Sequence, residues 1–286
     1  MLTPVSRILT GVTALLFLLV GVPLFALPSQ MAPIFAWKVT PFIAMTIGAW
    51  CLGNAWLAGI TTRRRDWRLV YSSSLHLWFF GVLELGVLVA FRQKLVMVGP
   101  ISWGYVAALV ASVITAVVGL LDWTRLRPKM EPIGPVTPRP IRGAVLAYIL
   151  FVGFLAVYGM FAAPGAIGTT GGIFPETMSA FTLRSFAAFY LTLALAVIPF
   201  LSERSLPPML HHSFASYGLI VMITWAAIAN IAFFDFVARP GGLLYIGAYL
   251  AVGIPVGIFL LKMGTGSRYS KSHPEVGPAP LNRSGR

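Results

Sequence analysis

Charged residues are scarce in this chain of 286 residues: they make up 10% of the sequence, whereas a soluble domain carries about a quarter. Cys51 is the only cysteine, so an intramolecular disulfide and a metal cluster held by several cysteines are excluded. The sequence also lacks the serine-hydrolase motif GxSxG, the zinc-protease motif HExxH, a Walker motif and the paired aspartates that hold magnesium pyrophosphate. We therefore predict no catalytic residue, no metal site and no cofactor, and an enzyme is less expected than a non-catalytic protein.

Long apolar stretches dominate the sequence, and 58% of the residues are hydrophobic. A stretch of about 18 or more apolar residues is long enough to cross a hydrocarbon core of about 30 Å as a helix. Eight such stretches are present, at 8–27, 39–60, 69–91, 101–121, 143–163, 180–202, 213–236 and 242–262. They predict an all-α polytopic integral membrane protein with eight transmembrane helices.

The first and second halves of the sequence resemble each other. Positions 39–50 align with 178–189, which sets Trp50 opposite Phe189, and positions 103–121 align with 243–261, which sets Tyr105 opposite Tyr245. Each copy contains four apolar stretches. Because four is an even number of spans, both copies enter the membrane in the same direction, so we predict two parallel four-helix repeats about an axis along the membrane normal.

This duplication divides the chain into four parts. Residues 1–121 form the first repeat and 143–264 the second, and they are joined by a proline-rich cytoplasmic linker at 122–142 that is expected to be extended and partly stiff. The basic tail at 265–286 has too little apolar surface to fold and is predicted to be disordered. A glycine-rich run at 165–172 has no lysine and follows no strand, so it is interpreted as a flexible loop and not as a phosphate site.

The net charge of +13 reflects membrane topology. With the N-terminus in the cytoplasm, the Lys and Arg residues fall in cytoplasmic segments with few exceptions, which are Lys38, Arg92, Lys94, Arg184 and Arg239. The positive-inside rule then places the protein in the cell membrane with both termini cytoplasmic. Membrane lipids with anionic headgroups are the expected partners of this charge, and nucleic acid is not.

Two charges lie inside predicted spans, where a charge is costly. Glu84 is expected about two turns from the outer surface in the third span, and Arg184 at a similar depth in the sixth. We predict that they form an ion pair across the repeat interface. Such a pair is either a substrate or proton site or a structural pair that docks the halves; a protonated, neutral Glu84 is the third alternative.

His76 precedes Glu84 by eight residues in the third span, so the two side chains can share a broad face of one helix. His211 and His212 are expected at the cytoplasmic mouth of the seventh span. No helix carries two histidines at a spacing that bridges a haem, and carboxylates and histidines do not recur at i, i+3 or i+4. Haem and metal are therefore not predicted, and His76 is expected to be hydrogen-bonded in a polar groove.

Two further polar residues, Thr224 and Asn230, complete the candidate ligand-binding set of Glu84, Arg184, His76, Asn230 and Thr224. In membrane spans such side chains often bond to a neighbouring helix. Pro199 and Pro255 are expected to kink the sixth and eighth spans and to free backbone carbonyls, either for packing or to line a cavity.

Three functions remain open from the sequence. The first is binding or transport of a small molecule or lipid at the interface of the two repeats. The alternative is a structural or assembly subunit that packs against other membrane subunits. A less favoured alternative is an intramembrane enzyme in which Glu84 acts as acid or base and His76 assists.

Overall fold

The computed structural model describes residues 2–163, 176, 178–237 and 240–265. The long elements in these ranges are eight helices, each apolar and long enough to cross a membrane. They are α1 (Pro4–Ala26), α3 (Pro41–Thr62), α4 (Trp67–Ala90), α5 (Pro100–Leu126), α6 (Arg139–Phe161), α7 (Ala180–Val197), α8 (Leu206–Ala229) and α9 (Gly241–Met263). The prediction of an all-helical, multi-pass membrane protein is confirmed at this level.

Proline starts most of these helices. Five have a proline in their first two positions, where its fixed φ and missing N–H are tolerated: Pro4, Pro41, Pro100, Pro140 and Pro207. The remaining elements are short: α2 (Pro28–Met31), η1 (Ala32–Ile34), η2 (Arg92–Lys94), η3 (Ile198–Leu201) and η4 (Ile231–Phe233). Pro199 lies in η3, so the sixth span tightens into a 3₁₀ turn at its end.

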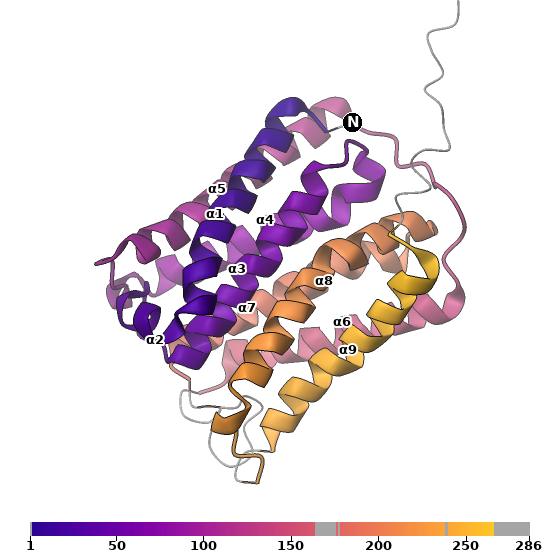
Figure 1. Ribbon diagram of the computed structural model, residues 1–286. Coiled ribbons are helices and arrows are strands. Elements are labelled where there is room, and N and C mark those ends of the chain that lie inside the picture. The colour runs from indigo at the N-terminus through magenta and orange to yellow at the C-terminus, as the bar shows by residue number, and fades with distance from the viewer. Residues whose placement is uncertain (1, 164–175, 177, 238–239, 266–286) are drawn as a thin grey trace, which may run out of the picture.

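The helices form two sets that meet in the middle of the bundle. We call residues 2–126 the first half and residues 139–265 the second half. Within the first half, α1 packs on α3 and α5, and α4 packs on α5; within the second, α6 packs on α7 and α8 on α9. The halves meet through α3 with α8 and through α4 with α7 and α8. Accordingly, α1 and α5 lie on one side of the molecule and α6 and α9 on the other (Figure 1).

Aromatic stacking and close backbone approach join the halves. The indole of Trp50 on α3 stacks on the ring of Phe189 on α7, with centroids 4.5 Å apart and planes 6° apart. Gly53 on α3 lies directly against Leu219 on α8, where a β-carbon would come within 2.6 Å of the Leu219 Cα. Both contacts are fully buried or nearly so. The centre of the bundle is therefore packed without room for a larger side chain.

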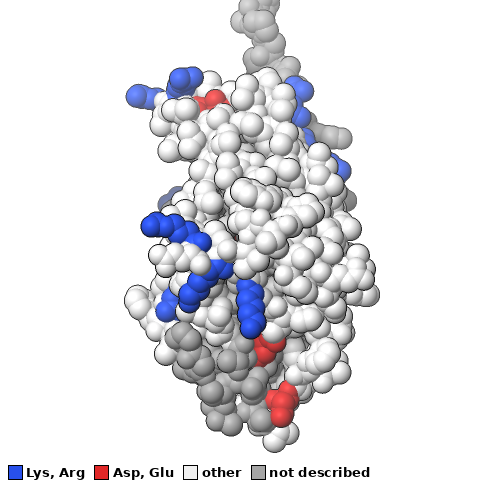
Figure 2. Space-filling view, turned by 90° about the vertical axis from the view of Figure 1, so that its left-hand side faces the viewer, with Lys and Arg blue, Asp and Glu red and all other residues white. Residues whose placement is uncertain are grey.

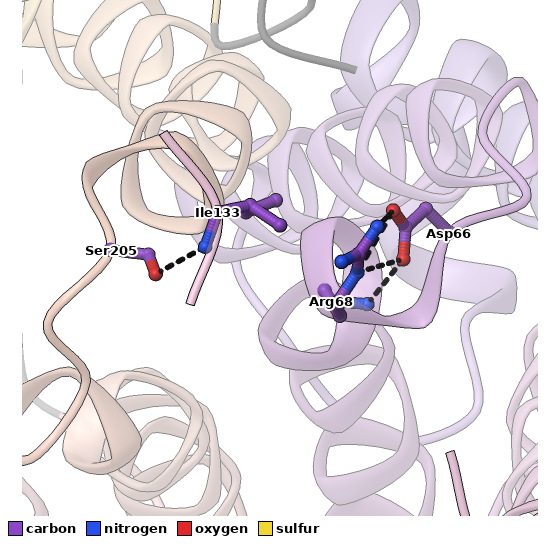
Figure 3. A network of polar contacts seen from close by, with 4 residues as sticks. All are labelled: Asp66, Arg68, Ile133 and Ser205. Carbon is purple, nitrogen blue, oxygen red and sulfur yellow. Dashed lines mark hydrogen bonds and ion pairs between the residues drawn. The ribbon is translucent and has the colours of Figure 1, made fainter. Parts of the chain in front are cut away.

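The linker is docked onto the bundle. We call the end that holds the α3–α4 turn, residues 127–138 and the α7–α8 turn the linker end. There the backbone N–H of Ile133 donates to the Ser205 hydroxyl at 2.9 Å (Figure 3), and Val136 forms an isolated bridge with Ser205. The Ile133 side chain is buried in one cluster with Trp67 of the first half and Phe200 of the second. The linker is therefore bound to both halves.

Two helix boundaries differ from those expected. The α5 helix continues to Leu126, so the non-helical linker is shorter than predicted. The α8 helix begins at Leu206, seven residues before the expected start, because the prolines of Leu206-Pro207-Pro208 suit a first helical turn. His211 and His212 are consequently buried inside α8 and do not lie at its mouth.

Charged side chains are few on the face that Figure 2 draws. One group of basic side chains lies near the top of that view and a second group lies from mid-height downward, with mostly uncharged side chains around them. The N-terminus and the end of α9 lie toward the same end of the bundle (Figure 1). The predicted disordered tail after Thr265, the glycine-rich run at 165–172 and Arg239 lie outside the described residues.

Replacing Gly53 with alanine tests the packing between the halves. We expect Gly53→Ala to lower the free energy of unfolding by about 1–3 kcal/mol, because the new methyl group overpacks against Leu219. The matched control is Gly59→Ala on the same helix, since a β-carbon at Gly59 meets nothing within 4 Å. The control should be neutral or slightly stabilising, because alanine favours a helix over glycine by about 1 kcal/mol. Thermal melting of both variants in detergent measures the difference, and equal melting temperatures would contradict this packing.

Candidate functional site

The five candidate residues come from three helices. Glu84 and His76 are on α4, Arg184 is on α7, Thr224 is on α8 and Asn230 caps the end of α8. The structure brings neither the set nor the predicted pair together. Each residue instead has its own surroundings.

Glu84 is fully buried where α4 meets α5 and α7. The Tyr105 hydroxyl of α5 donates to its Oε1 atom at 3.0 Å, and the Ser185 hydroxyl of α7 donates to the same oxygen. The other oxygen, Oε2, has no hydrogen-bond partner among the described residues. Glu84 thus links the two halves through Ser185, a residue that sequence reasoning missed although it is the neighbour of Arg184.

Arg184 points away from Glu84. Its Nη1 atom donates to the backbone carbonyls of Gly159 and Ala162, at 2.8 and 3.0 Å. These carbonyls end α6, where the last turn of a helix leaves acceptors without partners. Successive residues on a helix point about 100° apart, so Ser185 and Arg184 face different neighbours on α7. The predicted Glu84–Arg184 ion pair is therefore wrong.

The ion pair that the described residues do form lies at the linker end. Asp66 caps α4, and its Oδ2 atom lies 2.7 Å from Nη2 of Arg68 (Figure 3). Burial by itself would raise the pKa of Asp66, but hydrogen bonds from Arg68 and its positive charge outweigh burial and hold that pKa below its ordinary value. The pair thus adds stability at neutral pH, and this contribution is lost as the pH falls through the lowered pKa.

His76 meets a second histidine. Its ring lies 6.5 Å, centroid to centroid, from the ring of His212 on α8, and Nδ1 of His212 lies 3.5 Å from the Ser73 hydroxyl. Neither ring nitrogen of His76 has a hydrogen-bond partner within the described part of the chain, and no group of three or more metal-type ligands occurs there. The sequence analysis places His212 at the mouth of the seventh span, so it does not predict this contact between the two rings.

Thr224 and Asn230 make local bonds. The Thr224 hydroxyl donates to the Ile220 carbonyl at 2.7 Å, four residues back in its own helix. The Asn230 amide donates to the Ala226 carbonyl at 2.9 Å and to the sulfur of Met45 on α3 at 3.1 Å. Of the two, Asn230 alone bonds to a neighbouring helix, and it does so at the end of α8 opposite the linker end.

A hollow of about 580 Å³ lies at the linker end, and a second cavity lies within the second half. Its volume is about 420 Å³, it is partly open, and residues of α6, α7, η3, α8 and α9 line it. Most of the lining is aliphatic or aromatic, and its polar members are Tyr148, His212, Ser213 and Ser216. Pro255 of α9 also lines it, which is one of the two outcomes expected for that proline.

A smaller cavity of about 60 Å³ adjoins this one, and the two share Tyr148, Leu193, Ser216, Ile220 and Val252. The smaller cavity adds the tyrosines Tyr190, Tyr245 and Tyr249 to the polar lining. We refer to both together as the α6–α9 cavity, because α6 and α9 border it and are not packed against each other along their lengths. Little in the sequence points to this cavity, since an apolar lining in a membrane span looks like ordinary core or lipid-facing surface.

Basic residues lie close in sequence to two residues that line the cavity at the linker end. Ile141 in the first turn of α6 lines it, between Arg139 and Arg142 in the sequence. Phe259 near the end of α9 also lines it, and Lys262 follows within one turn. The wall is thus apolar, and three basic residues lie next in sequence to lining residues at this end: Arg139, Arg142 and Lys262.

Comparison of the chain with models of protein families, with curated proteins and with solved structures finds no match.

Double-mutant cycles test the surroundings of Glu84. Glu84→Gln combined with Tyr105→Phe should show a coupling energy of about 0.5–3 kcal/mol, because the two side chains share a hydrogen bond. Glu84→Gln combined with Arg184→Met should be additive within about 0.5 kcal/mol, since these residues share no bond. Unfolding free energies in detergent measure both cycles. A larger coupling with Arg184 than with Tyr105 would restore the ion pair.

Proposed function

We propose that this protein binds a membrane amphiphile, a lipid or a lipid-like molecule, in the α6–α9 cavity. The observation that carries the proposal is a partly open apolar cavity within the membrane-spanning helices, bordered by α6 and α9, with a few polar side chains in its wall. Ligand sites of about 300–1,000 Å³ with a mostly apolar lining and few polar groups are typical of small-molecule binding.

The chemistry of the wall favours a long apolar ligand. Aliphatic side chains of α7, α8 and α9 supply most of the surface, including Leu193, Ile220 and Val252. The serines and tyrosines in the wall can each make a hydrogen bond, whereas the described residues that line the two cavities include no Asp, Glu, Lys or Arg. An acyl or isoprenoid chain matches such a wall, because an apolar chain leaves no buried charge without a partner.

The mouth at the linker end favours an anionic headgroup. Arg139 and Arg142 at the start of α6 and Lys262 at the end of α9 lie next to residues that line the cavity. Arginine forms charge-assisted hydrogen bonds with phosphate, and each basic side chain near an anionic membrane surface contributes about 1 kcal/mol. The favoured ligand is therefore an anionic amphiphile whose chain lies between α6 and α9.

The contact between the halves is a poorer place for a ligand. Trp50 stacks on Phe189 there, and Gly53 lies against Leu219. Neither Glu84 nor Arg184 lines the α6–α9 cavity. The close packing supports a structural role for the contact between the halves and moves the proposed ligand site into the second half.

We also propose that the two halves are parallel four-helix repeats. A twofold axis that exchanges α3 with α7 and α4 with α8 also exchanges two of the contacts that join the halves, α3–α8 and α4–α7, and returns the third, α4–α8, to itself. Trp50 and Phe189, which align in sequence, stack on each other. In this arrangement α1 and α5 correspond to α6 and α9, and the α6–α9 cavity takes the place of the close α1–α5 contact.

Tryptophan substitutions test the ligand site. Val252→Trp fills the cavity wall, and we expect it to reduce the amount of lipid that co-purifies with the protein. The matched control is Ile254→Trp on the same helix, whose side chain is 58% exposed and should leave lipid binding unchanged. Native mass spectrometry of the purified proteins measures bound lipid. Equal lipid in both variants, with another membrane protein bound to each, would contradict the proposal and favour an assembly subunit.

Charge neutralisation tests the headgroup. The double variant Arg142→Gln with Lys262→Gln should lower the affinity for anionic lipid at least about fivefold and leave zwitterionic lipid binding unchanged. Arg63→Gln with Arg65→Gln is the control, because it removes the same charge from the α3–α4 turn of the first half. Titration with vesicles of phosphatidylglycerol or phosphatidylcholine measures both. A loss of equal size in the control would show a general attraction of charge and not a headgroup site.

The basic linker end supports a cell-membrane location with that end, and both termini, in the cytoplasm. In a Cys51→Ala background, Glu131→Cys reports on the linker and Val98→Cys on the opposite end. We expect a membrane-impermeant thiol reagent to label Val98→Cys in intact cells and Glu131→Cys only after lysis. The reverse pattern would invert the topology.

A further inference from the structure

Glu84 does not line the cavity, and it forms no ion pair with a basic side chain that the structure describes. The groups that face it are the hydroxyl of Tyr105 from α5, the hydroxyl of Ser185 from α7 and the thiol of Cys51 from α3. The histidines of α8 lie farther along the bundle, where His212 meets Ser73 and His76. Arg184 is bound to the end of α6. Among the residues that the structure describes, no cation therefore balances a negative charge on this carboxyl.

The hydrogen bonds distinguish the two oxygens of the carboxyl. A carboxylate spreads its charge over both oxygens, which together offer about four acceptor positions. Here both hydroxyl donors go to Oε1, and Oε2 has no partner among the described residues. This is the pattern of a neutral carboxylic acid, in which a carbonyl oxygen accepts two hydrogen bonds and the other oxygen carries the hydrogen.

The free-energy cost of burying each form of the carboxyl also favours the neutral acid. An ionised carboxylate buried in a low-dielectric interior without a counter-ion is far more costly than a neutral acid with one hydroxyl hydrogen left without an acceptor. The position is at the joint between the halves, where close packing leaves little room for a compensating cation to move in.

We propose that Glu84 is a proton-binding site: at neutral pH it holds a proton on Oε2, while Oε1 serves as the carbonyl acceptor for Tyr105 and Ser185. The bound proton makes the carboxyl a neutral link between α4, α5 and α7. Its release would leave a buried charge at the contact between the halves, so proton occupancy and the packing of α4 against α7 are coupled. This proposal does not depend on the α6–α9 cavity.

Infrared difference spectroscopy tests the proton. The spectrum of the wild-type protein minus that of Glu84→Gln should contain the carbonyl stretching band of a protonated carboxylic acid, shifted to lower frequency in D₂O. Bands of an ionised carboxylate in place of it would overturn the proposal. If those bands instead convert to and from the acid band with sodium concentration, the site binds a metal cation and the proposal also falls.

Variants that keep Glu84 test the assignment of the two oxygens. Tyr105→Phe and Ser185→Ala each remove one donor to Oε1, so each should raise the frequency of the acid band without abolishing it. The matched control is Tyr217→Phe, which removes a hydroxyl that donates to the Gly253 carbonyl and should leave the band in place. A band that the first two variants do not move would contradict the proposed bonding.

Isotope labelling tests the proposal on the wild-type protein, so the result does not depend on whether the Glu84→Gln variant folds. Wild-type protein containing ¹³C-carboxyl glutamate should keep an isotope-shifted acid band at neutral pH. Of the five glutamates, Glu84 is the one inside a long helix of the described chain, and the others lie in the linker, turns and tail. Complete loss of the labelled acid band at neutral pH would overturn the proposal without any substitution.

Discussion

The close packing of α3 and α4 against α7 and α8 is the contact on which the rest of the structure depends. Within a bilayer, polar groups have no water to bond with, so they must find partners in the protein. The stack of Trp50 on Phe189 and the approach of Gly53 to Leu219 bring the halves close enough for this. As a result, buried polar side chains meet across the contact: Ser185 reaches Glu84, and His212 reaches Ser73.

The two sides of the bundle then differ in how their outer helices pack. On one side α1 contacts both α3 and α5, and a hydrogen bond of 3.1 Å joins the hydroxyls of Thr13 and Thr115. On the other side α6 packs on α7 and α9 on α8, but α6 and α9 leave the cavity between them. A tightly packed centre can hold the second half in place while its outer helices admit a ligand. This division supports a binding role in the second half and a structural role for the centre.

The linker end connects these parts. The linker places Ile133 in a buried cluster with residues of both halves, so it adds to the contact between them. The same end of the bundle carries the charged cap of α4 and the basic residues beside the cavity mouth. The linker also leads directly into α6, one of the helices that border the cavity.

The sequence by itself determined the helical membrane architecture, because length and apolar composition decide which segments can cross a bilayer. It also marked Glu84 as a residue whose burial needs an explanation. It could not determine the partners of Glu84: Arg184 and Ser185 are neighbours in the sequence, and only the rotation of α7 decides which of them faces α4. The α6–α9 cavity was likewise decided by tertiary structure, because a gap between helices depends on their spacing, and apolar residues look the same in sequence whether they face lipid, core or cavity.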